Sequence, residues 1–485
     1  MIKPDDVFDR EQEWRALDAF VSSSRPGASL GLVYGRRRQG KTYLLQAMTE
    51  AVGGFYVAAL NQSREQNLQR LAEAYREFVG GRAPVAFGSW EQAFEALLAL
   101  GHDAERPVPV VVDEFPYLLG TAPELPSVVQ ALLSPRGPAA SWPTRLILCG
   151  SALSTMRGLL AGSAPLRGRA VLELVLRSFD VRDSARYWGV DHDPDVALRL
   201  HALVGGTPAY LDMSGGSGPA AAAEFDDWVA STLLNPASAM FREGDVLLSE
   251  EEVTDPAIYY SVLTAISQGR CRRSDIAAAI GRPQTAVAHP LEMLIRTGLV
   301  ERHDDALRDR RATFHVAEPI LRLHQLVVAP NESRLIRHRG AQVWSTVADT
   351  VSSNIYGPHF ESVARSWCLD HASPRTVGGI PSRVSSSEVS CREHRSTHEV
   401  DVVTVETVAG RPDRVTAIGE AKWRTRPVAG DQLRRLDHLR DVLELPEGTR
   451  LLLFSRSGFT PDLTGEARRR DDVELVDLHR LYEGD

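Results

Sequence analysis

Residues 35–42 read Gly-Arg-Arg-Arg-Gln-Gly-Lys-Thr, a complete G-x-x-x-x-G-K-[ST] phosphate loop. The apolar run at 29–34 predicts a buried strand before the loop, and residues 43–50 continue after it as a helix. Backbone N–H groups of such a loop and the N-terminus of the following helix attract phosphate, because both carry partial positive charge. The order strand, loop, helix therefore predicts a nucleotide site in a parallel α/β sheet.

The loop residues have separable roles in binding ATP. We expect Lys41 to reach the β- and γ-phosphates and the Thr42 hydroxyl to ligate Mg²⁺. The predicted nucleotide contacts are the whole loop and the next helix residue: Gly35, Arg36, Arg37, Arg38, Gln39, Gly40, Lys41, Thr42 and Tyr43. The alternative is a chance match in a turn, which the flanking strand and helix disfavour.

Two further apolar strands end in polar residues. The run at 108–112 leads into Asp113 and Glu114, the Walker B pattern, in which Asp113 holds Mg²⁺ and Glu114 polarises the attacking water. The run at 144–149 leads to Ser151, which we predict to sense the γ-phosphate or the water. A helix N-cap is the alternative role for this serine, and both roles are compatible. ATP and Mg²⁺ are therefore the predicted cofactors.

Composition limits the class of protein. At 485 residues the chain is too long for one core, and its 43% hydrophobic and 25% charged residues are typical of a soluble globular protein. Because no apolar run has the length of a membrane span and no signal-peptide core is present, we expect a cytoplasmic protein with no membrane partner. The four cysteines are far apart, which favours reduced thiols. With a net charge of -9, DNA contacts must come from local patches.

The pattern along the chain predicts several domains. Alternating strands and helices to residue 178 indicate a P-loop ATPase core with a parallel sheet, including a strand at 55–60 and helices at 63–79 and 89–100. A helical lid at 179–240 follows, with helices at 182–187, 195–204 and 225–233 and a break at 205–211. Residues 241–335 and 345–485 are expected to form two further domains.

The segment 241–335 is predicted to be a winged helix-turn-helix. Helices are expected at 255–267, 273–280 and 282–296, followed by a two-stranded wing at 299–302 and 312–316. Pro290 is expected to kink the third helix. The DNA contacts that this fold predicts are Arg282, Gln284 and Thr285, with Arg308, Arg310 and Arg311 on the wing. The alternative is a module that packs against other domains.

A second group of reactive side chains lies in the C-terminal α/β domain. Strands are expected at 398–405 and 414–419 after a helix at 356–369. Because side chains alternate along a strand, Glu420 and Lys422 share a face and can meet Asp401 of the neighbouring strand.

These residues predict a metal-dependent site. Asp401 and Glu420 are the expected Mg²⁺ ligands, with Glu361 of the preceding helix adding a carboxylate. Lys422 would stabilise negative charge on a phosphodiester, and Gln432 would support the attacking water or the phosphate. A degenerate domain that only binds or assembles is the alternative.

Cys391, His394 and His398 have a spacing that also occurs in zinc sites. A fourth ligand would have to come from Cys368 or His371, and nothing in the sequence requires either to be near. The sequence therefore favours a polar hairpin at this position.

Taken together, the motifs resemble the archaeal-type ATPase family of STAND and AAA-like P-loop NTPases. The matching segments are 8–11, 35–42, 113–117, 150–152, 165–169 and 205–211. Gly419-Glu-Ala-Lys-Trp423 resembles the PD-(D/E)xK nuclease-like domain that many members carry, which implies a restriction-endonuclease-like α/β fold. The resemblance also implies that Arg169, with Arg167, contacts the γ-phosphate or acts in trans, although Ala170 replaces the second of the paired arginines.

Two functions are compatible with these features. The first is an ATP-hydrolysing, DNA-associated protein with a Mg²⁺-dependent nuclease-type domain, in genome maintenance, mobile-element handling or defence. The second is a STAND-like regulatory or signalling ATPase with an inactive C-terminal interaction domain. Either one is compatible with a homo-oligomer or a protein partner.

Overall fold

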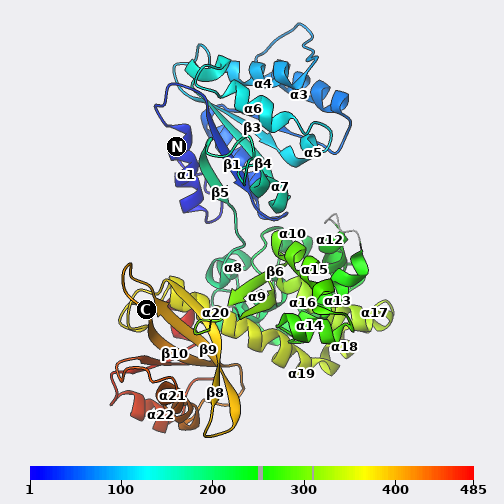
Figure 1. Cartoon of the computed structure of the whole chain (residues 1–485). Helices are drawn as coiled ribbons and strands as arrows, with labels where there is room; N and C mark the ends of the chain where they lie inside the picture. Colours follow the sequence, from blue (N-terminus) through cyan, green and yellow to red (C-terminus); the bar gives the residue numbers. More distant parts are fainter. Residues whose placement is uncertain (250–254, 309–310) are drawn as a thin grey trace. The chain divides into compact units, whose positions relative to one another are not determined.

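The computed structural model describes residues 1–249, 255–308 and 311–485. The chain divides into two compact units, Met1–Ser178 and Phe179–Asp485 (Figure 1). None of the helices in the described ranges is long and apolar enough to cross a membrane.

The N-terminal unit is built on a five-stranded parallel sheet in the order β2-β3-β4-β1-β5. Its strands are β1 (Ser29–Tyr34), β2 (Phe55–Ala58), β3 (Val108–Asp113), β4 (Thr144–Gly150) and β5 (Ala170–Val175). The three central strands are almost entirely buried, as expected for a parallel sheet covered on both faces. The predicted parallel α/β sheet is therefore confirmed.

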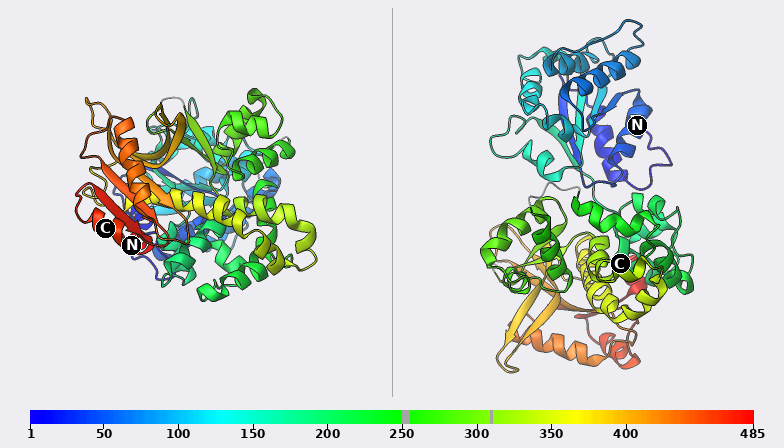
Figure 2. Two further views of the ribbon diagram at one scale, coloured as in Figure 1. Left: turned by 90° about the horizontal axis from the view of Figure 1, so that it is seen from below. Right: turned by 90° about the vertical axis from the view of Figure 1, so that its right-hand side faces the viewer.

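Helices cover both faces of this sheet (Figure 2, right). Apolar side chains of α1 (Glu11–Val21) and α2 (Lys41–Val52) pack on one face. Those of α3 (Arg64–Phe78), α4 (Trp90–Ala99), α5 (Phe115–Leu119), α6 (Leu125–Leu132) and α7 (Leu153–Gly158) pack on the other. Because β1, β3 and β4 run parallel, the residues that follow them meet at one edge of the sheet.

The second unit begins with short helices. These are α8 (Val181–Trp188), α9 (Pro194–Val204), α10 (Ala209–Met213), α11 (Phe225–Trp228) and α12 (Glu243–Ser249). Asp180 and Asp193 cap α8 and α9, since their carboxylates accept hydrogen bonds from first-turn backbone N–H groups. The expected break at 205–211 is shorter than predicted, because α10 already begins at Ala209.

Three helices and a two-stranded antiparallel sheet follow. The elements are α13 (Pro256–Ser267), α14 (Arg273–Ala279), α15 (Gln284–Arg296), β6 (Val300–Asp304) and β7 (Ala312–Val316). The prediction that the third helix starts at Arg282 is wrong by two residues, because Pro283 has an extended backbone and stands as the N-cap. Pro290 lies inside α15, which continues to Arg296.

A run of helices leads to the C-terminal sheet. It contains α16 (Pro319–Leu323), α17 (Ala329–Leu335), α18 (Gly340–Thr346), α19 (Ala348–Val351) and α20 (Gly357–Asp370). Their buried side chains share one continuous core with the preceding helices and with one face of the C-terminal sheet.

The C-terminal sheet has the order β12-β11-β10-β9-β8. Its strands are β8 (Arg383–Cys391), β9 (Ser396–Glu406), β10 (Arg414–Lys422), β11 (Arg450–Ser455) and β12 (Val473–Asp477). The β8, β9 and β10 pairings are antiparallel, whereas β10, β11 and β12 are parallel. α20 packs on one face and α21 (Gly430–Val442) on the other, with α22 (Pro461–Ala467) and α23 (Leu478–Glu483) completing the unit.

A pair of histidines joins α9 to α20. Nδ1 of His201 lies 2.9 Å from Nε2 of His359. Burial lowers the pKa of both imidazoles, and the charges of His201 and Arg322 lower the pKa of His359 further, to well below the usual 6.5. The folded state therefore holds this pair neutral.

This pair predicts a loss of stability in acid. The unfolded chain protonates both histidines near pH 6.5 and the folded chain does not, so the free energy of unfolding falls as pH drops below about 6.5. His359→Gln removes one of these groups, so we expect α9 and α20 to lose less hydrogen-exchange protection between pH 7.5 and 5.5 than in wild type. The exposed His479→Gln serves as the control. Equal pH dependence in wild type and His359→Gln would contradict the assignment.

Candidate functional site

The phosphate loop connects β1 to α2, and two of its glycines are required by the backbone. A Cβ on Gly35 would lie 2.4 Å from the carbonyl oxygen of Leu176. Gly40 has a φ of 81°, a left-handed conformation that favours glycine. Any side chain at Gly35 would therefore force the loop away from the segment that follows β5.

Lys41 begins α2 and points back across the loop. Its Nζ donates a hydrogen bond of 2.8 Å to the carbonyl of Arg36, and the residue is only 5% exposed. Burial lowers the pKa of Lys41, while the nearby Glu114 and Asp113 carboxylates oppose this shift. The ammonium group is thus held inside the loop, where a phosphate would meet it.

Asp113 ends β3 and is 1% exposed. Its Oδ2 accepts hydrogen bonds of 2.7 Å from the hydroxyls of Thr42 and Tyr56. Its Oδ1 accepts from the backbone N–H of Glu114 at 2.8 Å. The Thr42 hydroxyl and the Asp113 carboxylate are adjacent oxygen donors, and oxygen donors are the ligands that Mg²⁺ prefers.

Glu114 has a strained backbone. Its φ of 50° and ψ of 41° are left-handed, which is uncommon for a residue other than glycine. Ser151 donates to the Glu114 carboxylate at 3.0 and 3.1 Å. Such strained conformations are common at functional sites. Here the conformation places the carboxylate beside Ser151, which follows β4.

The other loop residues are tied to their surroundings. Arg37 donates to the Tyr117 hydroxyl at 3.1 Å, and Gln39 donates to the Ser178 hydroxyl at 3.0 Å. Arg38 has a φ of 65°. The Tyr43 hydroxyl donates to the Asp6 carboxylate at 2.7 Å, which directs this ring toward the N-terminal segment.

Tyr56 and Arg10 also contact residues of the nucleotide site. Tyr56 of β2 was not predicted as a site residue, because its contact with Asp113 depends on the pairing of β2 with β3, which the sequence does not reveal. Arg10 is 7% exposed and donates to the carbonyls of Gln39 at 3.5 Å and Arg177 at 2.8 Å. Arg10 therefore links the phosphate loop to the segment that follows β5.

Arg169 is half-buried just before β5, whose Ala170 pairs with Leu30, so it lies at the opposite end of the sheet from the phosphate loop. A contact with the γ-phosphate in the same chain does not fit this position, and the role of Arg169 in trans stays a prediction.

The second predicted site lies where β9 and β10 run side by side. Oδ2 of Asp401 accepts from the backbone N–H of Ala421 at 2.9 Å and lies 3.5 Å from Nζ of Lys422. Lys422 also forms an ion pair with Glu420. The structure therefore brings Asp401, Glu420 and Lys422 together.

Glu361 on α20 extends this group. Burial raises the pKa of Glu361 to about 8, and the negative charge of Asp401 adds to the shift. Arg365, one turn later on α20, donates to the backbone carbonyl of Asp401 at 2.9 Å. Helix α20 thus places one carboxyl and one guanidinium beside β9.

Helix α21 contributes a cation that sequence reasoning missed. Arg435 donates to Oε1 of Glu420 at 2.5 Å and to the carbonyl of Glu399 at 2.9 Å. Gln432, one turn earlier, donates to the Asp431 carboxylate at 2.6 Å. The sequence carried no signal for Arg435, because its contact with Glu420 depends on how α21 packs against β10.

These carboxylates fit a divalent cation by their chemistry. Glu420 is 1% exposed, and its Oε2 has no hydrogen-bond partner among the described residues. A buried carboxylate oxygen without a hydrogen-bond partner is costly, and a bound cation would relieve that cost. Lys422, positioned between Asp401 and Glu420, supplies part of that compensation.

The predicted DNA contacts fall in two places. Arg282, Gln284 and Thr285 are exposed at the start of α15, and Arg311 is exposed just before β7. Arg310 lies outside the described residues. Arg308 donates to the hydroxyl of Ser390 at 3.3 Å, so this side chain contacts β8.

The segment between β6 and β7 is docked on β8. The hydroxyl of Ser385 donates to the carbonyl of Asp304 at 2.7 Å, and that of Ser387 donates to the Asp305 carboxylate at 2.6 Å. Ala306 and Leu307 pack in the same apolar core as Val389. This part of the predicted wing is therefore an intramolecular contact.

The Cys391 segment forms the turn of the β8–β9 hairpin, as expected, but the suggested fourth ligands were wrong. The sequence favoured a polar hairpin and offered Cys368 or His371 as the fourth ligand. Instead, His438 of α21 joins Cys391, His394 and His398, with one potential ligand atom from each within 4.8 Å of all the others. His371 lies 3.3 Å from the Asp180 carboxylate, and Cys368 is buried in α20. His438 could not be identified from the sequence, because it reaches the other three residues only through a tertiary contact between the hairpin and α21.

Comparison with known proteins supports the N-terminal assignment. Residues 7–212 match the model of the family described as an ATPase domain predominantly from Archaea. An uncharacterized protein of Methanocaldococcus jannaschii is 22% identical over 331 residues, which is 67% of this chain and 70% of that protein.

Solved structures give more distant similarities. The Walker-type ATPase of Pyrococcus abyssi is 21% identical, with a TM-score of 0.49, over 67% of this chain and 97% of that one. The Aeropyrum pernix ORC2 protein in its ADPNP-ADP complexes is 17% identical, with a TM-score of 0.45, over 72% and 97%. The segment that matches the ATPase family contains the phosphate loop, the two acidic residues at the end of β3, and Ser151.

Proposed function

We propose that the chain is an ATP hydrolase that acts on DNA through a Mg²⁺-dependent, nuclease-type C-terminal site. The hydrolase part is supported by the contacts that link Thr42, Asp113, Glu114 and Ser151 at one edge of the parallel sheet. These residues come from the ends of β3 and β4 and from the start of α2, so they meet at one edge of the sheet, where phosphoryl transfer could take place.

In this proposal, each residue has one task at the phosphates. Lys41 stabilises negative charge on the β- and γ-phosphates, and Thr42 and Asp113 would hold Mg²⁺, which neutralises charge that develops there. Glu114 orients and polarises the attacking water. Ser151, bonded to the Glu114 carboxylate, holds that carboxylate until nucleotide and water compete for it.

The nuclease-type proposal rests on the buried carboxylate Glu420 with its unpartnered Oε2. Asp401 and Glu420 would hold Mg²⁺, with Glu361 as a third carboxylate; the metal would supply Lewis acidity toward a phosphodiester. Lys422 would stabilise the negative charge on the phosphate. Gln432, at the start of α21, would hold a water or a phosphate oxygen by its amide. We name the fold of this domain restriction-endonuclease-like as part of the same proposal.

Helices α13–α15 with β6 and β7 are proposed as a winged helix that binds DNA. Arg282, Gln284 and Thr285 are exposed at the start of α15, where a recognition helix presents its base contacts. The proposed partner is therefore double-stranded DNA, contacted by α15 and Arg311.

One observation favours the alternative function, a regulatory ATPase whose C-terminal domain only mediates contacts. Arg272 pairs with Glu388, and Ser385 and Ser387 bond the segment between β6 and β7, so the wing is engaged with β8. In this case the winged helix transmits the state of the ATPase and the C-terminal domain cuts nothing. Plasmid nicking by wild type, lost in Asp401→Ala, distinguishes the two functions.

Two variants test the ATPase site. Lys41→Ala should abolish ATP binding, because it removes the cation held inside the loop. Glu114→Gln should still bind ATP but turn it over about 10²- to 10⁴-fold more slowly, because the water loses its base while Asp113 is retained. Nucleotide titration and phosphate release measure both effects, with the exposed Glu95→Gln as the control. Wild-type turnover in Glu114→Gln would remove the assigned role of Glu114.

The nuclease-type site is tested by separating it from ATP hydrolysis. Asp401→Ala and Lys422→Ala should each reduce Mg²⁺-dependent plasmid cleavage by about 10²-fold or more and leave ATP turnover unchanged, because the ATPase residues lie in the other compact unit. The exposed Asp462→Ala is the matched control. If wild type cleaves none of linear, circular, single-stranded and branched DNA with any tested metal, the regulatory function stands instead.

DNA contact by α15 is tested through salt dependence. Replacing Arg282 and Arg311 together with alanine should weaken binding to duplex DNA and lower the slope of log affinity against log salt by about 2. Replacing the exposed Arg82 and Arg106 of the N-terminal unit controls for net charge. An unchanged slope in the first double variant would favour the packing role of the winged helix.

A further inference from the structure

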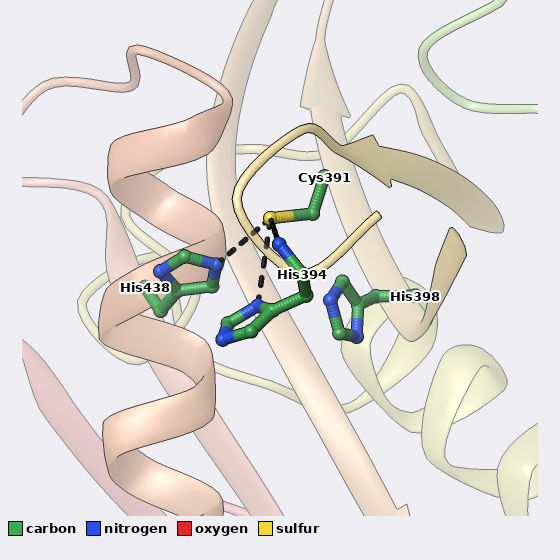
Figure 3. Close-up of side chains that lie close together, drawn as sticks. All are labelled: Cys391, His394, His398 and His438. Carbon is green, nitrogen blue, oxygen red and sulfur yellow. Dashed lines mark hydrogen bonds between the residues drawn. The ribbon is translucent and has the colours of Figure 1, made fainter. Parts of the chain in front are cut away.

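A cysteine and three histidines lie close together at the turn of the β8–β9 hairpin of the C-terminal sheet (Figure 3). Cys391 ends β8, His394 lies in the turn, His398 is in β9, and His438 is on α21. The potential ligand atoms, one per residue, all lie within 4.8 Å of one another. Among the described residues, this is the one group of three or more His, Cys, Asp or Glu side chains found within that distance.

We propose that these four residues bind a structural zinc ion that fastens the β8–β9 hairpin to α21. This site is separate from both sites of the proposed function. Its donors are a thiol and imidazoles rather than carboxylates, a set that selects zinc over magnesium.

The distances around the sulfur fit tetrahedral zinc. Sγ of Cys391 lies 3.5 Å from Nδ1 of His394 and 3.3 Å from Nε2 of His438. With Zn–S near 2.3 Å and Zn–N near 2.0 Å, a tetrahedron places sulfur and nitrogen ligands about 3.5 Å apart. Figure 3 shows the imidazoles of His394, His398 and His438 gathered beside that sulfur.

Neighbouring groups support a ligand role for two of the residues. The backbone N–H of His394 donates to Sγ of Cys391 at 3.4 Å, which stabilises a thiolate over a thiol. While Nε2 of His438 faces the sulfur, its Nδ1 lies 3.8 Å from the carboxylate of Glu393. A carboxylate near the outer nitrogen of an imidazole is the usual arrangement around zinc-bound histidine, because it orients the ring and raises its basicity.

Four protein ligands leave no open position for substrate, which indicates a structural rather than a catalytic ion. The elements that the ion would join are those that carry the carboxylate group. Asp401 lies three residues after His398 on strand β9. Arg435, which pairs with Glu420, precedes His438 by one turn of α21. Zinc would therefore fix the spacing between β9 and α21.

Metal content of the purified full-length chain tests the proposal. After removal of loosely bound metal by dialysis, mass spectrometry of the elements should find about one zinc per chain in wild type, as one tetrahedral site requires. Cys391→Ser, His394→Ala and His438→Ala should each lose most of it. His479→Ala, an exposed histidine outside the group, should retain it.

Cobalt provides a second measurement that reports the ligands directly. After zinc is removed, added Co²⁺ should give wild type a thiolate-to-cobalt absorption band and intense visible bands of tetrahedral cobalt, and Cys391→Ser should lose the first. His394 is exposed, so His394→Ala tests the site in a variant that should still fold, with ATP turnover of the other unit as a check. A wild-type chain that retains no zinc and gives no such cobalt spectrum overturns the proposal, as does equal zinc content in wild type and Cys391→Ser.

Discussion

A buried carboxylate, Asp113, connects the parts of the N-terminal site. It accepts hydrogen bonds from Thr42 at the start of α2, from Tyr56 of β2, and from the backbone of Glu114. Hydrogen bonds to a charged group stabilise by about 1.5–3 kcal/mol each, so this residue fixes the phosphate loop against β3 before nucleotide arrives. The left-handed backbone of Glu114 then presents its carboxylate to Ser151. All of this depends on the parallel order that places β1, β3 and β4 side by side.

The C-terminal sheet also carries a cluster of buried charged side chains, built from other elements. Asp401, Glu420 and Glu361 gather negative charge beside β9 and β10, and Lys422 and Arg435 neutralise part of it. A cation would fit at the Oε2 of Glu420, which has no hydrogen-bond partner among the described residues. The segment that follows β6 contacts β8, so a movement of α15 with β6 and β7 would reach β8 and the hairpin that β8 forms with β9.

The sequence predicted the elements that local pattern defines. Apolar runs located β1, β3 and β4 to within a residue, and the period of two placed Glu420 and Lys422 together. It did not identify Tyr56 or Arg435 as site residues, because their roles arise from strand order and helix packing. The Cys391, His394, His398 and His438 group was also only partly predictable. The first three residues form a motif in the sequence, but His438 joins them only because α21 packs on the sheet.

The central claim is that the edge of the parallel sheet is a Mg²⁺-dependent ATP-hydrolysing site. The most direct measurement is the steady-state release of phosphate from ATP by the purified wild-type chain, with Mg²⁺ and with the metal chelated. The account predicts turnover with Mg²⁺ that disappears on chelation and returns when Mg²⁺ is restored. A chain that binds no ATP in the presence of Mg²⁺, or that hydrolyses it equally well without the metal, would contradict the account.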